Sequence, residues 1–311
     1  MNVLKVCERC LLILLFVICT SMLAATCISA ESLNGKKQFR VAMSAAFVSE
    51  TGVEVYEKIV AYLAQKTGIE GEFVTGLAYD TINLMLESGH VDFGFVCGLP
   101  YVLAHDRSEP AVYLIGAPVM QAKRYGNQPK YYSNVIVRKG APYQKLEDLV
   151  GKIFVYNEEL SNSGYNMARY EFIQKGLHKK KGFFGDIKRS GSHEESIRMV
   201  AQGEADYSFV DSLVLDYDRK NGFGHASGVR VIDTVGPAGI PPIVVSNQVD
   251  QAKRNMIQHY LLNMHQEPEG RKILDSALVS HFVEVDDSNY DDIRHMNKVA
   301  EEEAYIVIEK R

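Results

Sequence analysis

Small polar residues stand directly ahead of an apolar, helix-like run at residues 158–172, EELSNSGYNMARYEF. These small polar residues are Ser161, Asn162, Ser163 and Gly164. They come after the strand-like run KIFVYN, at the point where a strand is expected to turn into a helix. The first N–H groups of a helix lack partners within the helix, and the helix dipole is positive there. These residues could therefore bind an anion without any lysine. Alternatively, Ser161 or Ser163 is only a helix N-cap, worth about 1 kcal/mol.

Two more polar positions follow strand-like runs in the same half of the chain. In SGSHEES, Ser192 and Glu195 have the spacing of a capping box, and His193 falls in the first turn of that helix. In YSFVDS, Asp211 ends an apolar run, where a carboxylate is costly unless it is paired, liganded or hydrated. Capping the next helix would also explain Asp211. Because ligands bind at the carboxyl edge of α/β sheets, we expect these positions to meet there.

Four further residues are candidate ligand contacts outside that region. Ser133 lies in YYSNV, where the chain is expected to pass between two halves, and Tyr101 lies just past the strand-like run ending in CG. Phe47 and Tyr79 stand on comparable loops and could form aromatic walls. For any one of the aromatic residues, packing in the core is the alternative explanation.

Catalytic signatures are scarce in this sequence. It contains no G-x-S-x-G elbow, no H-E-x-x-H pair and no P-loop. Ser163, His193 and Asp211 could form a triad, which makes an exported hydrolase the enzymatic alternative, but no elbow surrounds the serine. We therefore predict no catalytic residue, no cofactor and no metal.

Strand-like and helical runs alternate along the chain and define the elements that position these residues. Residues 38–44 read as a strand, and 53–68 as a helix with one apolar face that ends at Gly68. The same alternation restarts after residue 133, and it predicts α/β layers around mainly parallel sheets.

The length of the chain predicts two lobes joined by two crossings. About 280 residues remain after the leader described below, more than one core usually spans. We assign residues 31–132 with 235–311 to lobe 1 and residues 133–234 to lobe 2. The crossings are expected near 130–134 and 232–238, and the cleft between such lobes is a natural ligand site.

The first 30 residues have the layout of a secretory signal peptide. A short basic start with Lys5 and Arg9 precedes an apolar run too short to span a bilayer comfortably, and small residues continue to Ala30. Lipid attachment at Cys27 is the alternative to cleavage after Ala30. Four of the five cysteines lie in this leader, so only Cys97 remains, and no internal disulfide can form. We expect Cys97 to be inert and the protein to be periplasmic.

The charge balance argues against a nucleic-acid partner. Loss of Lys5 and Arg9 leaves 32 of the 34 basic residues, and loss of Glu8 leaves 38 of the 39 acidic ones, a formal charge of −6. A protein that tracks a phosphate backbone would carry a basic surface instead.

Five sequence blocks resemble, in the same order, those of the periplasmic phosphonate, phosphite and phosphate-binding proteins of ABC importers. The blocks are DFGFVCGLPY, YYSNVIVRKG, LSNSGYNMARYEF, GSHEESIRMVAQGEADYSFVDS and HFVEVDDSNYDDIR, and the resemblance covers nearly all of residues 40–295. It implies a two-lobe, type II binding-protein fold that closes on an oxyanion. The phosphoryl oxygens would be held by Ser133, Ser161, Ser163 and Gly164, with Asn162 where the family often has Thr. His193 and Ser192 would join from the next helix, and Tyr101 from the other lobe.

Departures from the family pattern bear on the choice of ligand. Relatives that bind aminoalkylphosphonates meet the ammonium with carboxylates, and the matching positions here are Leu213 and Pro241. This weakens the case for 2-aminoethylphosphonate. An ionised Asp211 can only accept hydrogen bonds, so it would favour a protonated phosphorus oxyanion over sulfate.

The function predicted from the sequence is therefore capture of a small phosphorus oxyanion and its delivery to an ABC permease by a monomeric binding protein. A ligand sensor that docks on a membrane receptor is the alternative among binding proteins, because it would use the same site.

Overall fold

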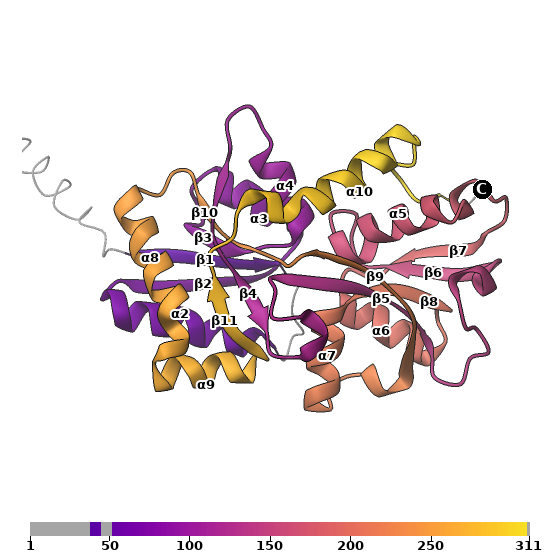
Figure 1. Cartoon of the computed structure of the whole chain (residues 1–311), viewed down its shortest axis with the longest axis horizontal. Helices are drawn as coiled ribbons and strands as arrows, with labels where there is room; N and C mark the ends of the chain where they lie inside the picture. Colours follow the sequence, from indigo (N-terminus) through magenta and orange to yellow (C-terminus); the bar gives the residue numbers. More distant parts are fainter. Residues whose placement is uncertain (1–37, 45–51, 310–311) are drawn as a thin grey trace, which may run out of the picture. The chain divides into compact units, whose positions relative to one another are not determined.

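The computed structural model describes residues 38–44 and 52–309 of the chain. The predictions for the signal peptide, Cys27 and Phe47 concern residues outside this part. Two sheets flanked by helices make up the described structure (Figure 1).

The first sheet has six strands in the order β11-β4-β10-β3-β1-β2. These are β1 (Gln38–Ser44), β2 (Glu70–Leu77), β3 (Phe93–Phe95), β4 (Val112–Met120), β10 (Ile243–Ser246) and β11 (Val279–Val283). Helices α3 (Tyr79–Glu87) and α4 (Gly98–His105) lie above it in the view of Figure 1, and α2 (Val53–Thr67) and α9 (Pro268–Ser276) lie below it. Helix α8 (Gln251–Asn263) packs against β4 and β11. The predicted end of the first helix is confirmed, because Gly68 adopts the left-handed conformation at the C-cap of α2.

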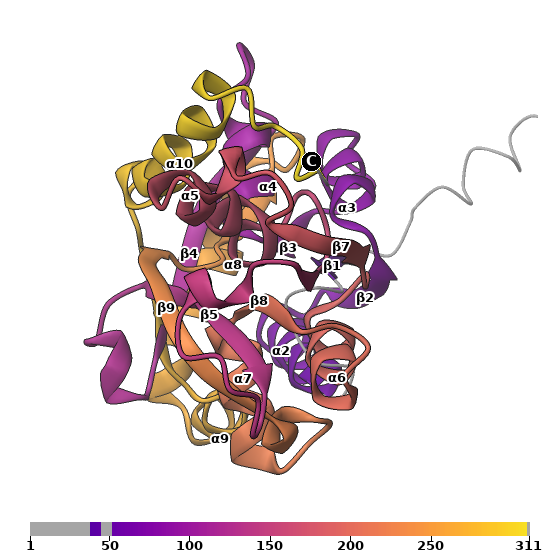
Figure 2. The ribbon, with the colours of Figure 1, turned by 90° about the vertical axis from the view of Figure 1, so that its right-hand side faces the viewer.

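The second sheet has five strands in the order β7-β6-β8-β5-β9. These are β5 (Lys130–Arg138), β6 (Lys152–Tyr156), β7 (Phe184–Arg189), β8 (Tyr207–Asp211) and β9 (Val229–Gly239). Helix α5 (Met167–Gln174) lies on one side of it, and α6 (His193–Gln202) and α7 (Ser212–Asn221) lie on the other, as Figures 1 and 2 show. Aromatic side chains fill its core, and Phe154 packs edge-on against both Phe172 and Phe209.

Strand pairing in both sheets is mixed, which corrects the expectation of mainly parallel sheets. The pairs β1–β3, β6–β7 and β6–β8 are parallel, whereas β10 pairs antiparallel with both β3 and β4, and β11 pairs antiparallel with β4. Strand β5 pairs antiparallel with β8 and β9. Strands joined through a helix run parallel, but β5 and β10, the first strands after each passage between the sheets, enter from the other end.

The chain passes from the first sheet to the second between Met120 and Lys130 and returns between Gly239 and Ile243. The lobe boundaries given above stay a prediction. After β11 the chain leaves the first sheet again, because α10 (Asp291–Glu302) packs against α5 as well as α4. Within the described residues, no helix combines the length and the apolar character needed to cross a membrane.

Candidate functional site

The stretch that follows β6 forms a capped helical turn, as one of the two sequence interpretations predicts. Ser161 is extended and its Oγ accepts a hydrogen bond from the Gly164 N–H at 3.0 Å. Residues Asn162–Asn166 then form a π-helical turn that continues directly into α5. The cap therefore exists, but it does not account for the burial of the residues around it.

Polar side chains from several elements converge on this turn and are withdrawn from solvent. Ser161, Asn162 and Ser163 have no exposed surface. Ser133 of β5, also fully buried, donates from Oγ to the Ser163 carbonyl oxygen at 2.8 Å. We call the group the Ser163 cluster, and it consists of Ser133, Ser161, Asn162, Ser163, Gly164, His193 and Asp211.

His193 joins the cluster from the first turn of α6. Its ring is 1% exposed, with Nε2 at 3.3 Å from Ser163 Oγ. Its Nδ1 accepts from the Asp211 backbone N–H at 3.4 Å, so the ring proton of the neutral histidine lies on Nε2. Burial lowers the pKa of His193 to about 3, so the ring is neutral at pH 7. His193 therefore presents an N–H donor to the Ser163 side of the cluster.

This arrangement is not that of a Ser-His-Asp triad. In a triad the aspartate carboxylate accepts from histidine Nδ1–H, which frees Nε2 to take the serine proton. Here Asp211 reaches Nδ1 through its backbone N–H, and its carboxylate Oδ1 accepts from the Leu213 N–H at 2.7 Å as the N-cap of α7. With the proton on Nε2, His193 cannot act as a base toward Ser163.

Asp211 is the acidic member of the cluster, and it is 2% exposed. Burial raises its pKa to about 8, although hydrogen bonds from the backbone of Leu213 and Val214 and from the Ser163 side chain act in the opposite direction. Among the described residues, no lysine or arginine forms an ion pair with this carboxylate. At pH 7 most molecules without ligand therefore carry a protonated Asp211.

Gly164 is required by close packing rather than by an unusual backbone angle. A Cβ at this position would lie 1.9 Å from Asn157 Oδ1 and 3.1 Å from His193 Cε1. Asn157 follows β6, is fully buried, and has Nδ2 at 3.4 Å from His193 Nε2, while its Oδ1 has no hydrogen-bond partner. The sequence analysis missed Asn157, although its place at the end of KIFVYN was the available signal.

Two more neighbours of the cluster were not predicted as contacts. Tyr131 of β5 accepts from Asn162 Nδ2 at 3.0 Å, and burial holds the pKa of its hydroxyl well above the usual range. The sulfur of Cys97 accepts from the Asn162 backbone N–H at 3.3 Å. Burial raises the pKa of this thiol to about 11, so it stays protonated at neutral pH.

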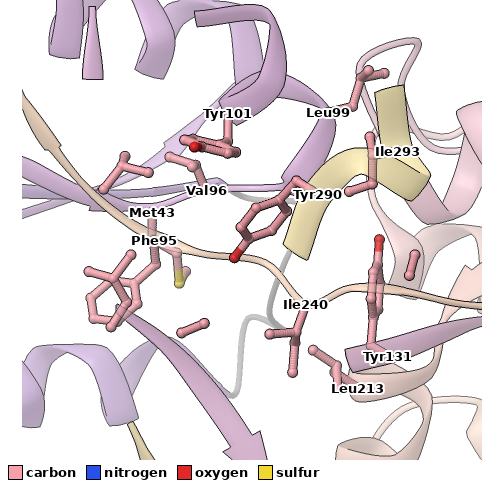
Figure 3. Packing of buried hydrophobic residues seen from close by; sticks show 14 of the residues in the cluster. Met43, Phe95, Val96, Leu99, Tyr101, Tyr131, Leu213, Ile240, Tyr290 and Ile293 are labelled. Atoms are coloured by element: carbon pink, nitrogen blue, oxygen red, sulfur yellow. The ribbon is translucent and has the colours of Figure 1, made fainter. Parts of the chain in front are cut away.

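The remaining sequence candidates lie in different surroundings. Tyr79 is buried at the start of α3 beside Cys97 and Leu160, and a side-chain hydrogen bond links it to Ser161. Tyr101 is not brought to the cluster. Its hydroxyl donates to Asp287, and its ring centroid is 4.8 Å from that of Tyr290. Figure 3 shows the two tyrosine rings packed against each other.

Ser192 is used as a helix cap. Its Oγ accepts from the Glu195 N–H at 3.1 Å, which confirms half of the predicted capping box. The Glu195 carboxylate pairs with Arg198 instead of returning to the cap. Within residues 38–44 and 52–309, no group of three or more His, Cys, Asp and Glu side chains is placed to hold a metal ion.

The chain has the type II periplasmic binding protein fold. Its two mixed sheets are flanked by helices and joined by two passages of the chain, and buried polar groups lie at the ends of strands. The chain belongs to the periplasmic substrate-binding proteins of phosphonate ABC transporters. The model of this family, described as "ABC transporter, phosphonate, periplasmic substrate-binding protein", matches residues 41–290.

Solved structures share the fold at low sequence identity. A binding protein component of an ABC phosphonate transporter from Pseudomonas aeruginosa is 20% identical, with a TM-score of 0.75 over 86% of this chain and 87% of that chain. PhnD1 from Prochlorococcus marinus, in complex with methylphosphonate, is 17% identical, with a TM-score of 0.76 over 86% of this chain and 99% of that chain. A protein from Xanthomonas citri bound to ATP is 15% identical, with a TM-score of 0.65 over 87% of this chain and 99% of that chain.

Proposed function

We propose that this protein captures a small phosphorus oxyanion, a phosphonate, phosphite or phosphate, in the Ser163 cluster and delivers it to an ABC permease from the periplasm. The observation that carries the proposal is the burial of so many hydrogen-bonding groups in one place. Three serine hydroxyls, an asparagine amide and a neutral histidine meet there with almost no exposed surface. Polar groups are costly to bury, and a packed core would use apolar side chains at these positions.

The donors in the cluster match a tetrahedral oxyanion. Ser163 Oγ and His193 Nε2 lie 3.3 Å apart and could donate to the same phosphoryl oxygen or to neighbouring ones. The hydroxyls of Ser133 and Ser161 and the first N–H groups of the helical turn could supply further donors. The Ser133 hydroxyl and the N–H groups of Asn162 and Gly164 already donate within the protein, so they would exchange these acceptors for the ligand. Each charge-assisted hydrogen bond would contribute on the order of 1.5–3 kcal/mol.

A phosphorus oxyanion beside Asp211 would share one proton with its carboxyl group. A protonated Asp211 donates to a dianion, and an ionised Asp211 accepts from a monoanion, so the complex holds the same proton in either case. The raised pKa of Asp211 refines the selectivity proposed from the sequence. Sulfate can accept from the protonated carboxyl at low pH, and it is rejected only where Asp211 is ionised, above about pH 8.

Calorimetric titration and thermal unfolding of the purified protein test the proposal. Methylphosphonate, phosphite, phosphate and sulfate are each titrated at pH 7 and pH 9. At about 100 times its dissociation constant, a true ligand should add roughly 2.7 kcal/mol to the free energy of unfolding. We expect at least one phosphorus oxyanion to bind and sulfate binding to be weaker at pH 9 than at pH 7.

A pair of serine variants locates the binding. Ser163→Ala should weaken the bound phosphorus oxyanion at least tenfold, because it removes a donor from the cluster. Ser208→Ala is the matched control, since Ser208 is equally buried in β8 but its hydroxyl bonds to the Phe209 carbonyl oxygen. Absence of binding by any phosphorus oxyanion, or equal losses in both variants, would contradict the proposal.

A further inference from the structure

An apolar cleft adjoins the Ser163 cluster. Its empty space is about 660 Å³, including the part that opens to solvent. Helix α2, strands β3, β4 and β11 and helix α7 line it, so both sheets with their helices contribute to its walls. Tyr56, Phe95, Tyr217 and Phe282 supply aromatic surface.

Two short stretches of chain place the cleft next to the cluster. Leu213 lines the cleft, and its N–H donates to Asp211 Oδ1 at 2.7 Å. On the other side, Phe95 lines the cleft two residues before Cys97, whose sulfur accepts from the Asn162 N–H. A ligand whose phosphoryl group lies in the cluster would therefore have the cleft as the space for its substituent.

None of the described residues that line this cleft carries a charge. Leu213 and Pro241, the positions where the sequence resemblance implies carboxylates in aminoalkylphosphonate binders, both lie in its wall. Figure 3 shows Leu213 near Tyr131, whose hydroxyl accepts from Asn162 Nδ2 of the cluster. An ammonium group would lose its hydration here without gaining a counter-charge, whereas an alkyl or aryl group would lose nothing.

We propose that the protein selects phosphonates with an uncharged apolar substituent, an alkyl chain of a few carbons or a single aromatic ring, and excludes aminoalkylphosphonates. The inference rests on the proposed function, because it assumes that the phosphoryl group is held by the Ser163 cluster.

Affinity should rise with apolar surface until the substituent fills the cleft. Each methylene moved out of water is worth about fourfold in the dissociation constant. Butylphosphonate and phenylphosphonate should thus bind at least tenfold more tightly than methylphosphonate, and 2-aminoethylphosphonate more weakly than ethylphosphonate.

The experiment is a calorimetric titration of the purified protein with methyl-, ethyl-, butyl-, phenyl- and 2-aminoethylphosphonate at pH 7. If affinity rises from methyl to butyl and the ammonium weakens binding, the inference holds. If methylphosphonate binds but the larger apolar ligands bind no better, or the amino compound binds best, the inference is overturned while the proposed function stands. If no phosphonate binds, the proposed function fails and the inference fails with it.

Filling the cleft tests where the substituent lies. Ala277 lines the cleft at the end of α9, and Ala277→Phe should weaken butylphosphonate at least tenfold more than it weakens methylphosphonate. Ala252→Phe, at an exposed position of α8, is the matched control and should change neither affinity. Equal losses for the two ligands in Ala277→Phe would place the substituent elsewhere.

Discussion

Asp211 and His193 contact each other, with 3.4 Å between the Asp211 backbone N and His193 Nδ1, yet burial moves their pKa values in opposite directions. The folded protein holds a proton on Asp211 up to about pH 8, whereas an aspartate in the unfolded chain releases it near 3.8. The free energy of unfolding therefore falls as pH rises through that window. His193 has the reverse effect, because its pKa falls from 6.5 to about 3, so its contribution is lost as pH drops below 6.5.

Asp211→Asn should therefore stabilise the protein without ligand at high pH. Asparagine keeps the oxygen that accepts from the Leu213 N–H but cannot ionise. We expect the variant to exceed the wild type in free energy of unfolding by at least about 1 kcal/mol at pH 9. At pH 5 this advantage should be smaller, because only the lower part of the window between 3.8 and about 8 has been crossed, and urea unfolding at the two pH values measures the difference.

Asp186→Asn serves as the control, because Asp186 is exposed on β7 of the same sheet. Its effect should be the same at both pH values to within a few tenths of a kcal/mol. If Asp211→Asn changed stability equally at pH 5 and pH 9, the buried carboxylate would not be the titrating group.

At the scale of elements, Arg169 connects the helical turn of the cluster to the end of the chain. It is 4% exposed, and its guanidinium donates to Asn166 Oδ1 at 2.9 Å, to Asn297 Oδ1 of α10 at 2.8 Å and to the Ile306 carbonyl oxygen at 2.9 Å. The Ile308 N–H adds a bond to the Tyr165 hydroxyl at 2.8 Å. These hydrogen bonds connect the turn that carries Asn162 and Ser163 to α10 and to the residues that follow α10.

Replacing Arg169 should lower the free energy of unfolding substantially, although all of its hydrogen-bond partners are uncharged. Arg169→Met keeps much of the packing but leaves three acceptors without their donor, of which Asn166 Oδ1 belongs to a buried residue, and each hydrogen bond from a charged group contributes about 1.5–3 kcal/mol. We expect a loss of at least 2 kcal/mol in urea unfolding. Arg198→Met is the comparison, because Arg198 pairs with Glu195 and Glu204 at a partly exposed position, where ion pairs contribute about 1 kcal/mol or less. A larger loss at Arg198 would contradict this ranking.

At the scale of the whole molecule, the formal charge is −5 although the proposed ligand is an anion. The proposed site contains hydrogen-bond donors and a protonated carboxyl rather than lysine or arginine. The proposed site therefore has no cationic side chain to attract the ligand over a distance, and the net charge opposes capture weakly.

Salt should accordingly leave binding intact. Between about 20 and 300 mM NaCl, screening removes a weak repulsion, so the dissociation constant of the bound phosphonate should stay constant or fall by up to about threefold. Titration calorimetry at the two concentrations measures it, and sodium gluconate in place of NaCl controls for competition by chloride. A tenfold weakening in both salts would show that a cationic group attracts the ligand.

The sequence by itself determined what depends on neighbours within a few residues. The end of α2 at Gly68 and the caps at Ser161, Ser192 and Asp211 follow from local hydrogen bonding and periodicity, and all are observed. The five sequence blocks and their order also identified the family, because both can be read directly from the sequence.

Only the tertiary structure decided which side chains meet. Asn157 and Cys97 contact the cluster, while Tyr101 is paired with Asp287, which lies 186 residues further along the chain. The mixed pairing of the strands, the burial that sets the pKa of Asp211 and the uncharged walls of the cleft are likewise products of packing. Such contacts join residues far apart in sequence, so their partners and their loss of water are fixed only when the sheets and helices are assembled.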